Sequence, residues 1–497
     1  MTQYHLAAIL IAAVGPLLAL ARRFRIPESM LLFGAGVAST TVPGLPPPAV
    51  DPELVMTLFL PPLLYASTVR VTWHLLRFTF WPGVVLGSVL AATAIAAIAV
   101  ATRGFFLPGL GWPAAILIGS VAAFFDTRLF HEAKGRLRVP RAIGDTLKAR
   151  ELAGRILILA TLGLVEDHLV SNRTIGEHIL GNYVMGIPGG ILAGLLVGHV
   201  AVRLRRRIDP APMEIAVSVA TPYAAALLAA VAGVSAAGAI ITSALVVSAV
   251  RVDRETGATI SSTEARINAT AFWEQASLMI SSGLFLLAGR AVPGALGALG
   301  TWPLWQVAGT AAGILMLALA VQLCFSYAAA RMLPVSAALV ERDEPKTSPL
   351  AAAVVMTWSS TRSVIALLLA LSIPATLPGG EPFRERDLIL AVATLVVIGS
   401  LAIQGLSLRR VVRWAGLADS SDDEEEEAAA RSAIQEAAAS SPDGDALDVD
   451  AARQKLLRMR EGDEIGDEVM TRMMREADLA ARASEKDVLP GAGPPQP

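Results

Sequence analysis

The chain has 497 residues, of which 54% are hydrophobic and only 17% are charged, and its mean hydropathy is +0.57. A soluble protein of this size carries about a quarter charged residues, so the composition argues against an ordinary soluble enzyme. The formal net charge of −2 argues against a nucleic-acid binder, which has a basic face. The single cysteine, Cys324, excludes an intramolecular disulfide framework and a cysteine-rich metal site. The chain is therefore predicted to be an integral membrane protein.

Apolar stretches long enough to cross a lipid bilayer recur along most of the chain. A helix needs about twenty apolar residues to span a membrane, and runs this long leave no room for a soluble core. We therefore predict an all-α polytopic membrane protein with about 13 transmembrane helices. They are expected at residues 4–21, 29–45, 54–68, 79–102, 111–131, 145–167, 178–202, 212–233, 235–250, 271–292, 303–330, 349–373 and 387–408.

Basic residues alternate between the predicted loops. Short cytoplasmic loops are the ones enriched in lysine and arginine, and here the loops after odd-numbered spans are enriched. The amino terminus is therefore expected outside and the carboxyl-terminal tail in the cytoplasm, in a multi-pass protein of the plasma (inner) membrane. The enriched loops include 22–25, 134–141, 203–207 and 409–413, whereas the other loops hold only Arg103, Arg173, Arg290, Arg384 and Arg386.

The character of the chain changes after the last predicted span. Residues 422–427 form an unbroken acidic run, and alanine, serine and proline dominate as far as residue 450. Such a composition buries little apolar surface and predicts a disordered linker. Apolar residues recur at helical spacing beyond it, which indicates amphipathic helices. We expect three parts: a transmembrane domain at 1–415, an acidic disordered linker at 416–450 and a cytoplasmic helical tail at 451–497.

Ionisable residues interrupt several predicted spans, and each costs a few kcal/mol at the bilayer centre. The uncharged run of the sixth span, 156–165, is only about half as long as a crossing requires. The span must therefore include Glu151 and Arg155, or Glu166 and Asp167, or both pairs. Glu151 and Arg155 lie four residues apart and so on one helix face. They form either an ion pair near the cytoplasmic boundary or part of a functional site.

Asp126 lies within the fifth predicted span and Arg362 within the twelfth. Asp126 is either a salt-bridged residue near the inner interface or an ion ligand, because intramembrane carboxylates mark ion routes. A carboxylate can hold a monovalent cation or a proton, which is what exchange requires. Arg362 needs an acidic or carbonyl partner at that depth. The sequence shows no phosphate loop, no nucleophile elbow and no metal-ligand spacing of histidines, so we expect no enzyme activity, no cofactor and no metal.

Several segments resemble one family of transporters. Residues 43–62 are similar to the second and third spans of bacterial sodium/proton antiporters of the monovalent cation:proton antiporter-1 family. Residues 272–289, which include Glu274 and Ser281, resemble the tenth span of that family. Residues 358–374 look like its W-x-G-L-R-G-A-V stretch, with Arg362 at the motif arginine, and residues 453–480 resemble the end of many members.

The resemblance implies an inverted-repeat antiporter fold with a core domain and a dimerisation domain. In the core, two broken helices would cross near the midplane, as in secondary transporters generally. It also implies a homodimer in the lipid bilayer that exchanges sodium or potassium for protons by an elevator-like movement.

The candidate ion site departs from the family pattern. The T-D-P of the fifth span is Phe125-Asp126-Thr127 here, so the aspartate is kept and its neighbours are not. The later E-G-E-S-L-L-N-D falls on residues 148–155. Its asparagine-aspartate pair becomes Gly154-Arg155, and its second glutamate becomes Arg150. Glu151 takes the place of the serine.

These changes leave two interpretations open. Arg155 could neutralise Asp126 and leave no site for sodium, or Glu151 could supply the missing carboxylate one turn away. The leading hypothesis is a cation/proton antiporter whose rewired site uses Asp126, Thr127 and Glu151, with Arg155, Arg362 and Arg150 as charge partners. One alternative is a non-transporting membrane scaffold or regulator. Another is transport of an anion or organic acid, because embedded basic residues are numerous.

Overall fold

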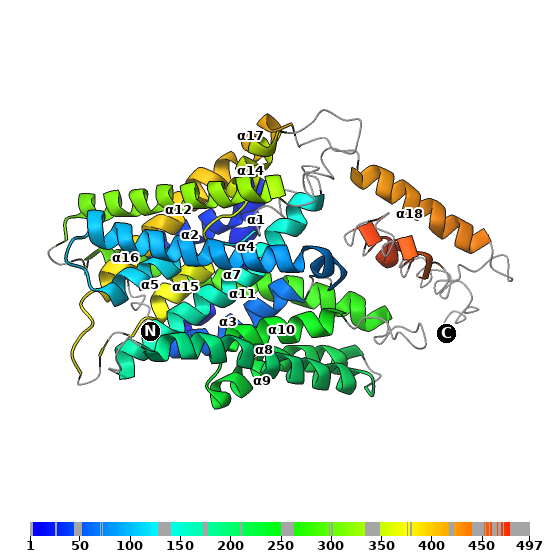
Figure 1. Cartoon of the computed structure of the whole chain (residues 1–497), viewed down its shortest axis with the longest axis horizontal. Helices are drawn as coiled ribbons and strands as arrows, with labels where there is room; N and C mark the ends of the chain where they lie inside the picture. Colours follow the sequence, from blue (N-terminus) through cyan, green and yellow to red (C-terminus); the bar gives the residue numbers. More distant parts are fainter. Residues whose placement is uncertain are drawn as a thin grey trace, which may run out of the picture.

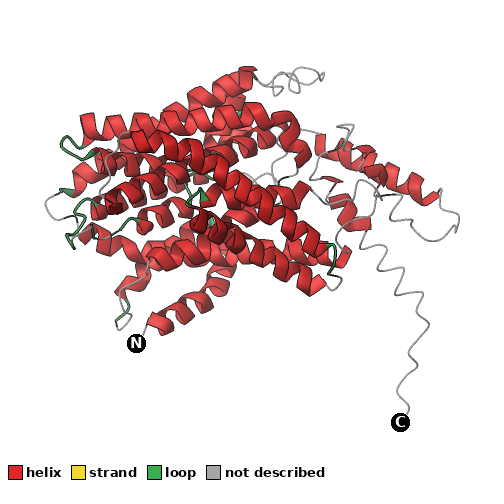
Figure 2. Cartoon of the chain, turned by 60° about the horizontal axis from the view of Figure 1, so that its bottom comes forward, coloured by secondary structure: helices red, strands yellow, loops and turns green. Residues whose placement is uncertain are grey.

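The structure is a computed structural model, and nearly all of its described residues are helical (Figures 1 and 2). It describes residues 3–24, 27–43, 52–69, 71, 73–127, 141–171, 177–208, 211–249, 263–297, 299, 302–332, 348–374, 376–377, 380–416, 422–439 and scattered positions between 452 and 477. Within these residues, the extended pairings are two isolated bridges, Asp126 with Thr361 and Thr376 with Pro382.

The helices follow the apolar stretches of the sequence closely, and each of the thirteen stretches contains described helix. They are α1 (Gln3–Phe24), α2 (Glu28–Ala38), α3 (Pro52–Thr68), α4 (Trp73–Ala101), α5 (Trp112–Ala123), α7 (Arg141–Ser171), α8 (Glu177–Arg205), α9 (Ala211–Ala232), α10 (Ala236–Ala249), α11 (Thr263–Gly297), α12 (Leu304–Met332), α14 (Pro349–Trp358), α15 (Val364–Ser372), α16 (Arg386–Ser400), α17 (Leu406–Trp414) and α18 (Asp422–Ala439).

Six stretches of described helix are long and apolar enough to cross a membrane, and three further apolar helices, α5, α10 and α14, are shorter. The polytopic all-α membrane protein is therefore confirmed in outline, and the count of thirteen crossings stays a prediction. The six stretches are Gly83–Phe106, Tyr183–Arg205, Pro212–Ala232, Ala271–Gly294, Leu304–Arg331 and Arg386–Trp414.

Among the described residues, the fifth and twelfth stretches contain breaks in the interior of the bundle. The fifth ends its helix at Ala123, after which the backbone is extended at Phe124. The twelfth is divided into α14 and α15 by residues 359–363. That segment is Ser-Ser-Thr-Arg-Ser, and such side chains compete for backbone hydrogen bonds, which disfavours a helix interior. The Ser363 hydroxyl accepts from the backbone N–H of Ile365, 3.3 Å away, and so caps the first turn of α15.

The interrupted helices lie in the interior of the bundle. α15 reads Val-Ile-Ala-Leu-Leu-Leu-Ala-Leu-Ser, which is apolar all round, and such a helix has to be buried. Residues 365–370 are buried, as are most residues of α5 and α16, and the three helices share the main apolar core. The breaks therefore lie against the main apolar core of the bundle.

Close helix packing uses the small residues that the sequence repeats every fourth position. Gly190, Gly194 and Gly198 of α8 face α10, where a side chain at any of them would meet the carbonyl of Ser235, Ala239 or Ser243. Small residues of this kind let two helix backbones approach. The role of these glycines in the structure is helix packing.

The tail differs from its prediction in one respect. Residues 422–439, expected within a disordered linker, form the helix α18. Its Ala430 joins a small apolar cluster with Leu456, Ile465, Val469 and Met473 of the following segment. The acidic run thus continues into an alanine-rich stretch, and alanine is the strongest helix former. In Figure 1, α18 lies to the right of the bundle, beyond the labelled membrane-domain helices.

Candidate functional site

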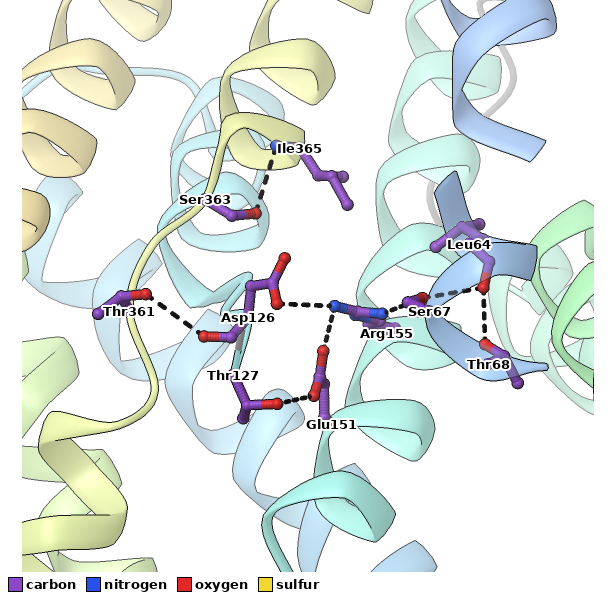
Figure 3. Close-up of polar contacts among 10 residues, drawn as sticks. All are labelled: Leu64, Ser67, Thr68, Asp126, Thr127, Glu151, Arg155, Thr361, Ser363 and Ile365. Carbon is purple, nitrogen blue, oxygen red and sulfur yellow. Dashed lines mark hydrogen bonds and ion pairs between the residues drawn. The ribbon is translucent and has the colours of Figure 1, made fainter. Parts of the chain in front are cut away.

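The break after α5 and the break between α14 and α15 meet through their backbones. The N–H of Asp126 donates to the carbonyl of Thr361 at 2.8 Å, and the N–H of Thr361 donates back to the carbonyl of Asp126 at 3.1 Å. The Thr361 hydroxyl also reaches the Asp126 carbonyl, 3.4 Å away (Figure 3). Backbone groups that leave a helix must find partners when they are buried, and here each break satisfies the other.

Arg155 of α7 lies between two carboxylates. One of its terminal nitrogens, Nη2, pairs with Oε1 of Glu151 and lies 3.5 Å from Oδ1 of Asp126 (Figure 3). The Arg155 side chain is 2% exposed, and the two carboxylate side chains are 10% exposed or less. Isolated buried charges are costly, and pairing Arg155 with the two carboxylates offsets part of the desolvation cost of all three. With both acids ionised it carries one net negative charge.

Two hydroxyls complete the polar cluster. The Thr127 hydroxyl donates to Oε2 of Glu151 at 2.6 Å, so the same carboxylate is held from two sides. Nη1 of Arg155 donates to the Ser67 hydroxyl of α3 at 2.8 Å, and Ser67 donates in turn to the carbonyl of Leu64 (Figure 3). The guanidinium also lies 5.6 Å from the centre of the Phe124 ring. The cluster therefore joins α3, α7 and the break after α5.

The structure brings four of the predicted site residues together and places the others elsewhere. Asp126, Thr127, Glu151 and Arg155 form the cluster, and Gly154 lies beside it, against Phe125 and α4. Arg150 points instead to α12, where it donates to Ser326. Because successive residues on a helix are turned by about 100°, Arg150 and Glu151 face different neighbours.

Three further predicted positions take other surroundings. Arg362 donates through its backbone N–H to the hydroxyl of Ser400 at 2.9 Å, and its side chain reaches Gln322 of α12. Glu274 has an exposed side chain on α11. Ser281, also on α11, is buried and donates to the carbonyl of Ser277 at 2.6 Å.

Three polar residues that support the site are absent from the sequence prediction. Ser67 anchors Arg155, and Ser400 receives the backbone N–H of Arg362. Gln404, in a π-helical turn after α16, donates to the carbonyls of Thr357 and Ser360, where α14 ends. For Gln404 the sequence did hold a signal. A glutamine within an apolar span is expected to be buried, and a buried amide must find hydrogen-bond partners.

The chain matches known proteins over most of its length. The family described as sodium/hydrogen exchanger, transmembrane, matches residues 9–414. An uncharacterised Na(+)/H(+) exchanger of Mycobacterium tuberculosis, Rv2287, is 30% identical over 82% of this chain and 74% of its own length. The Na(+)/H(+) antiporter NhaS2 of Synechocystis is 28% identical over 83% of this chain and 71% of its own.

A solved structure supports the fold independently of close sequence identity. The sodium proton antiporter MjNhaP1 of Methanocaldococcus jannaschii, determined at pH 8, superposes with a TM-score of 0.58 at 15% identity. The match covers 81% of this chain and 98% of that one. The bundle with its interrupted helices is thus an antiporter fold. The chain belongs to the transmembrane sodium/hydrogen exchanger family.

Proposed function

We propose that this protein is a secondary active transporter that exchanges a monovalent cation, sodium or potassium, for protons. The observation that carries the proposal is the convergence of Asp126 and Glu151 on the meeting point of the two helix breaks. Membership of the exchanger family and the names of the relatives, which are Na(+)/H(+) antiporters, support the same function.

The two carboxylates supply the chemistry that exchange needs. An ionised carboxylate is a hard oxygen ligand for a small cation. The same carboxylate can instead take up a proton, which makes it a neutral carboxyl group. The Thr127 hydroxyl and the carbonyl of Thr361 add neutral oxygens close to Asp126. A dehydrated monovalent cation can be coordinated by such oxygens, and its charge would balance the net negative charge of the cluster.

Arg155 makes this site atypical. Its guanidinium occupies the space between the two carboxylates, where a cation would be bound most strongly. In the proposed cycle the incoming cation competes with Arg155 for Asp126, and Arg155 remains paired with Glu151. The i,i+4 spacing explains why the Glu151–Arg155 pair persists while the Asp126–Arg155 pair breaks. Glu151 and Arg155 stay on one face of α7, whereas Asp126 belongs to another segment.

A second candidate function rests on the same ion pairs. If Arg155 stays paired with both carboxylates and no cation displaces it, the protein keeps the fold without transporting and acts as a membrane scaffold or regulator. The folded tail, with its own apolar cluster around Val469 and Met473, is the part that would then contact a partner.

Flux measurements separate the two functions. Purified protein in proteoliposomes, loaded with a pH-sensitive dye, should show proton movement when sodium or potassium is added outside. Asp126→Asn should abolish it, whereas Glu274→Gln, at an exposed position, should leave it unchanged. Absence of flux for either cation from pH 5 to pH 9 would favour the scaffold. Flux that survives Asp126→Asn would show that another carboxylate binds the ion.

The surrounding architecture is proposed on the resemblance. The protein would be a homodimer in the plasma membrane, built from inverted repeats with a core and a dimerisation domain, and with its tail in the cytoplasm. The core would contain the paired helix breaks and would move across the membrane against the dimerisation domain. Crosslinking in membranes, or native mass spectrometry, tests the dimer.

A further inference from the structure

Two arginines in the interior of the bundle have no acidic partner among the described residues. Arg150 of α7 is 0% exposed, and Arg362, between α14 and α15, is 2% exposed. In the part of the chain that the structure describes, neither guanidinium pairs with a carboxylate, unlike that of Arg155. Burying an arginine without a counter-charge costs several kcal/mol, so each of these residues requires an explanation.

Both arginines reach the same face of α12. Nη1 of Arg150 donates to the hydroxyl of Ser326 at 3.2 Å, and Nη1 of Arg362 approaches Oε1 of Gln322 at 3.5 Å. Residues four apart on a helix are neighbours, with Cβ atoms about 5–6 Å apart. Two positive charges from different elements, α7 and the break after α14, are therefore directed at one turn of α12.

The unsatisfied polar atoms at this place are all hydrogen-bond donors. Among the described residues they are Nε and Nη2 of Arg150, Nε of Arg362 and Nε2 of Gln322, each buried without a hydrogen-bond partner. Guanidinium and amide nitrogens can only donate. A ligand that satisfies this set must accept several hydrogen bonds and carry negative charge, which excludes a cation and fits an anion.

We infer that Arg150, Arg362 and Gln322 form a binding site for a small monovalent anion, of which chloride is the probe. The anion would lie against α12 between the two guanidinium groups and offset part of their charge. Complete burial of the Arg150 side chain favours a ligand of one or a few atoms over an organic acid. The site is separate from the Asp126, Glu151 and Arg155 cluster and does not depend on whether that cluster transports ions.

Thermal unfolding of the full-length protein in detergent tests the inference. The midpoint should be higher in sodium chloride than in sodium gluconate at equal ionic strength, and the rise should saturate with chloride, because a ligand that binds only the folded state stabilises it. Arg150→Gln should remove the chloride-dependent rise. Arg150→Glu should remove it too while keeping a high midpoint in gluconate, because the new carboxylate can pair with Arg362.

A matched control is available in another buried arginine. Arg290 of α11 is 4% exposed, and its guanidinium donates to the carbonyl and hydroxyl of Ser39 at 2.8 and 2.9 Å. Arg290→Gln should lower the midpoint but keep the chloride-dependent rise. Equal wild-type midpoints in chloride and gluconate, or a rise that persists in Arg150→Gln, would overturn the inference.

Bromide gives a readout that does not depend on any variant folding. Crystals of the wild-type protein grown with bromide should show an anomalous peak between Arg150 and Arg362. A bromide concentration that saturates the thermal effect but gives no peak there would contradict the site. Neither measurement involves cation flux, so failure of this inference and failure of the proposed exchange are distinguishable.

Discussion

The side-chain amide of Gln404 donates a hydrogen bond to the carbonyl of Thr357, 3.0 Å away, where α14 ends. The same amide nitrogen lies 3.3 Å from the carbonyl of Ser360, and the Gln404 carbonyl oxygen accepts from the hydroxyl of Ser400. The last carbonyls of a helix have no partner within it. Gln404 therefore supplies a hydrogen-bond donor to the carbonyls at the buried C-terminal end of α14, and it fixes the position of the break that carries Arg362.

Gln404→Leu should destabilise the protein and disturb the break. The substitution leaves two buried carbonyls with one donor fewer, and an unsatisfied buried group costs about 1–3 kcal/mol. The expected result is a lower thermal unfolding midpoint in detergent. Gln275→Leu, at an exposed position of α11, is the control and should leave the midpoint close to that of the wild type. Equal effects of the two variants would show that Gln404 has no special role.

Restoring the family pattern at the site should increase exchange. Arg155→Asp with Gly154→Asn removes the resident guanidinium and adds oxygen ligands. A side chain at 154 would begin 3.5 Å from the carbonyl of Gly87 and 3.8 Å from Phe125, which is ordinary contact. We expect cation-driven proton flux to rise about tenfold, equivalent to about 1.4 kcal/mol.

The increase should depend on the carboxylates. Adding Glu151→Ser to that pair of substitutions leaves two acids in place of three, and flux should stay above the wild-type level. Adding Asp126→Asn to the double substitution should abolish the flux. Flux in proteoliposomes that is lower than wild type, from protein that remains monodisperse, would mean that Arg155 takes part in transport.

Reporter fusions should reveal the orientation of the chain. Arginine enrichment predicts that fusions after Arg207 and after Arg413 report the cytoplasm. A fusion after Gly380 should report the outside. Gly380 has φ +83 and sits in a tight turn between α15 and α16, closed by its N–H donating to the carbonyl of Leu377, so an insertion there need not break a helix. A cytoplasmic signal after Gly380 would contradict the thirteen-span arrangement.

The tail should be separable from the membrane domain. The chain leaves α17 at Gly416, whose φ of +69 ends the helix, and α18 packs with Leu456 and Val469 in a cluster of its own. Truncation after Gly416 should therefore leave a folded, membrane-inserted dimer, judged by size-exclusion chromatography in detergent. A matched test is Val469→Asp in the full chain, which should unfold the tail alone. Aggregation of the truncated protein would show that the tail supports the bundle.

Much of the fold could be predicted because its causes are local. Apolar runs such as 304–332 indicate membrane helices directly, and the i,i+4 spacing of Glu151 and Arg155 predicts their ion pair. Arg150 could not be placed from the sequence, because its direction depends on how α7 is rotated against α12. The helix at 422–439 is not predicted, because its acidic start dominates the composition, while Ala430 packs with Leu456 and Val469 of the later segment.

The site was predictable only in part, because its contacts join residues that are far apart in the sequence. Asp126 was found as a charge in an apolar stretch, but its pairing with Thr361 joins residues 235 apart in sequence. No periodicity encodes such a contact. Nothing in the sequence around Ser67 distinguishes it from other serines, because its role comes from the hydrogen bond that it accepts from Arg155 of α7.

The backbone pairing of Asp126 with Thr361 also bears on how this site could change during evolution. Its two N–H to carbonyl bonds use main-chain atoms alone, so any residue except proline at these two positions can supply them. The pairing itself therefore does not specify which side chains stand at the neighbouring positions 125 and 127. Substitutions beside the paired residues can thus change the ligands offered to an ion while the contact between the two breaks is kept.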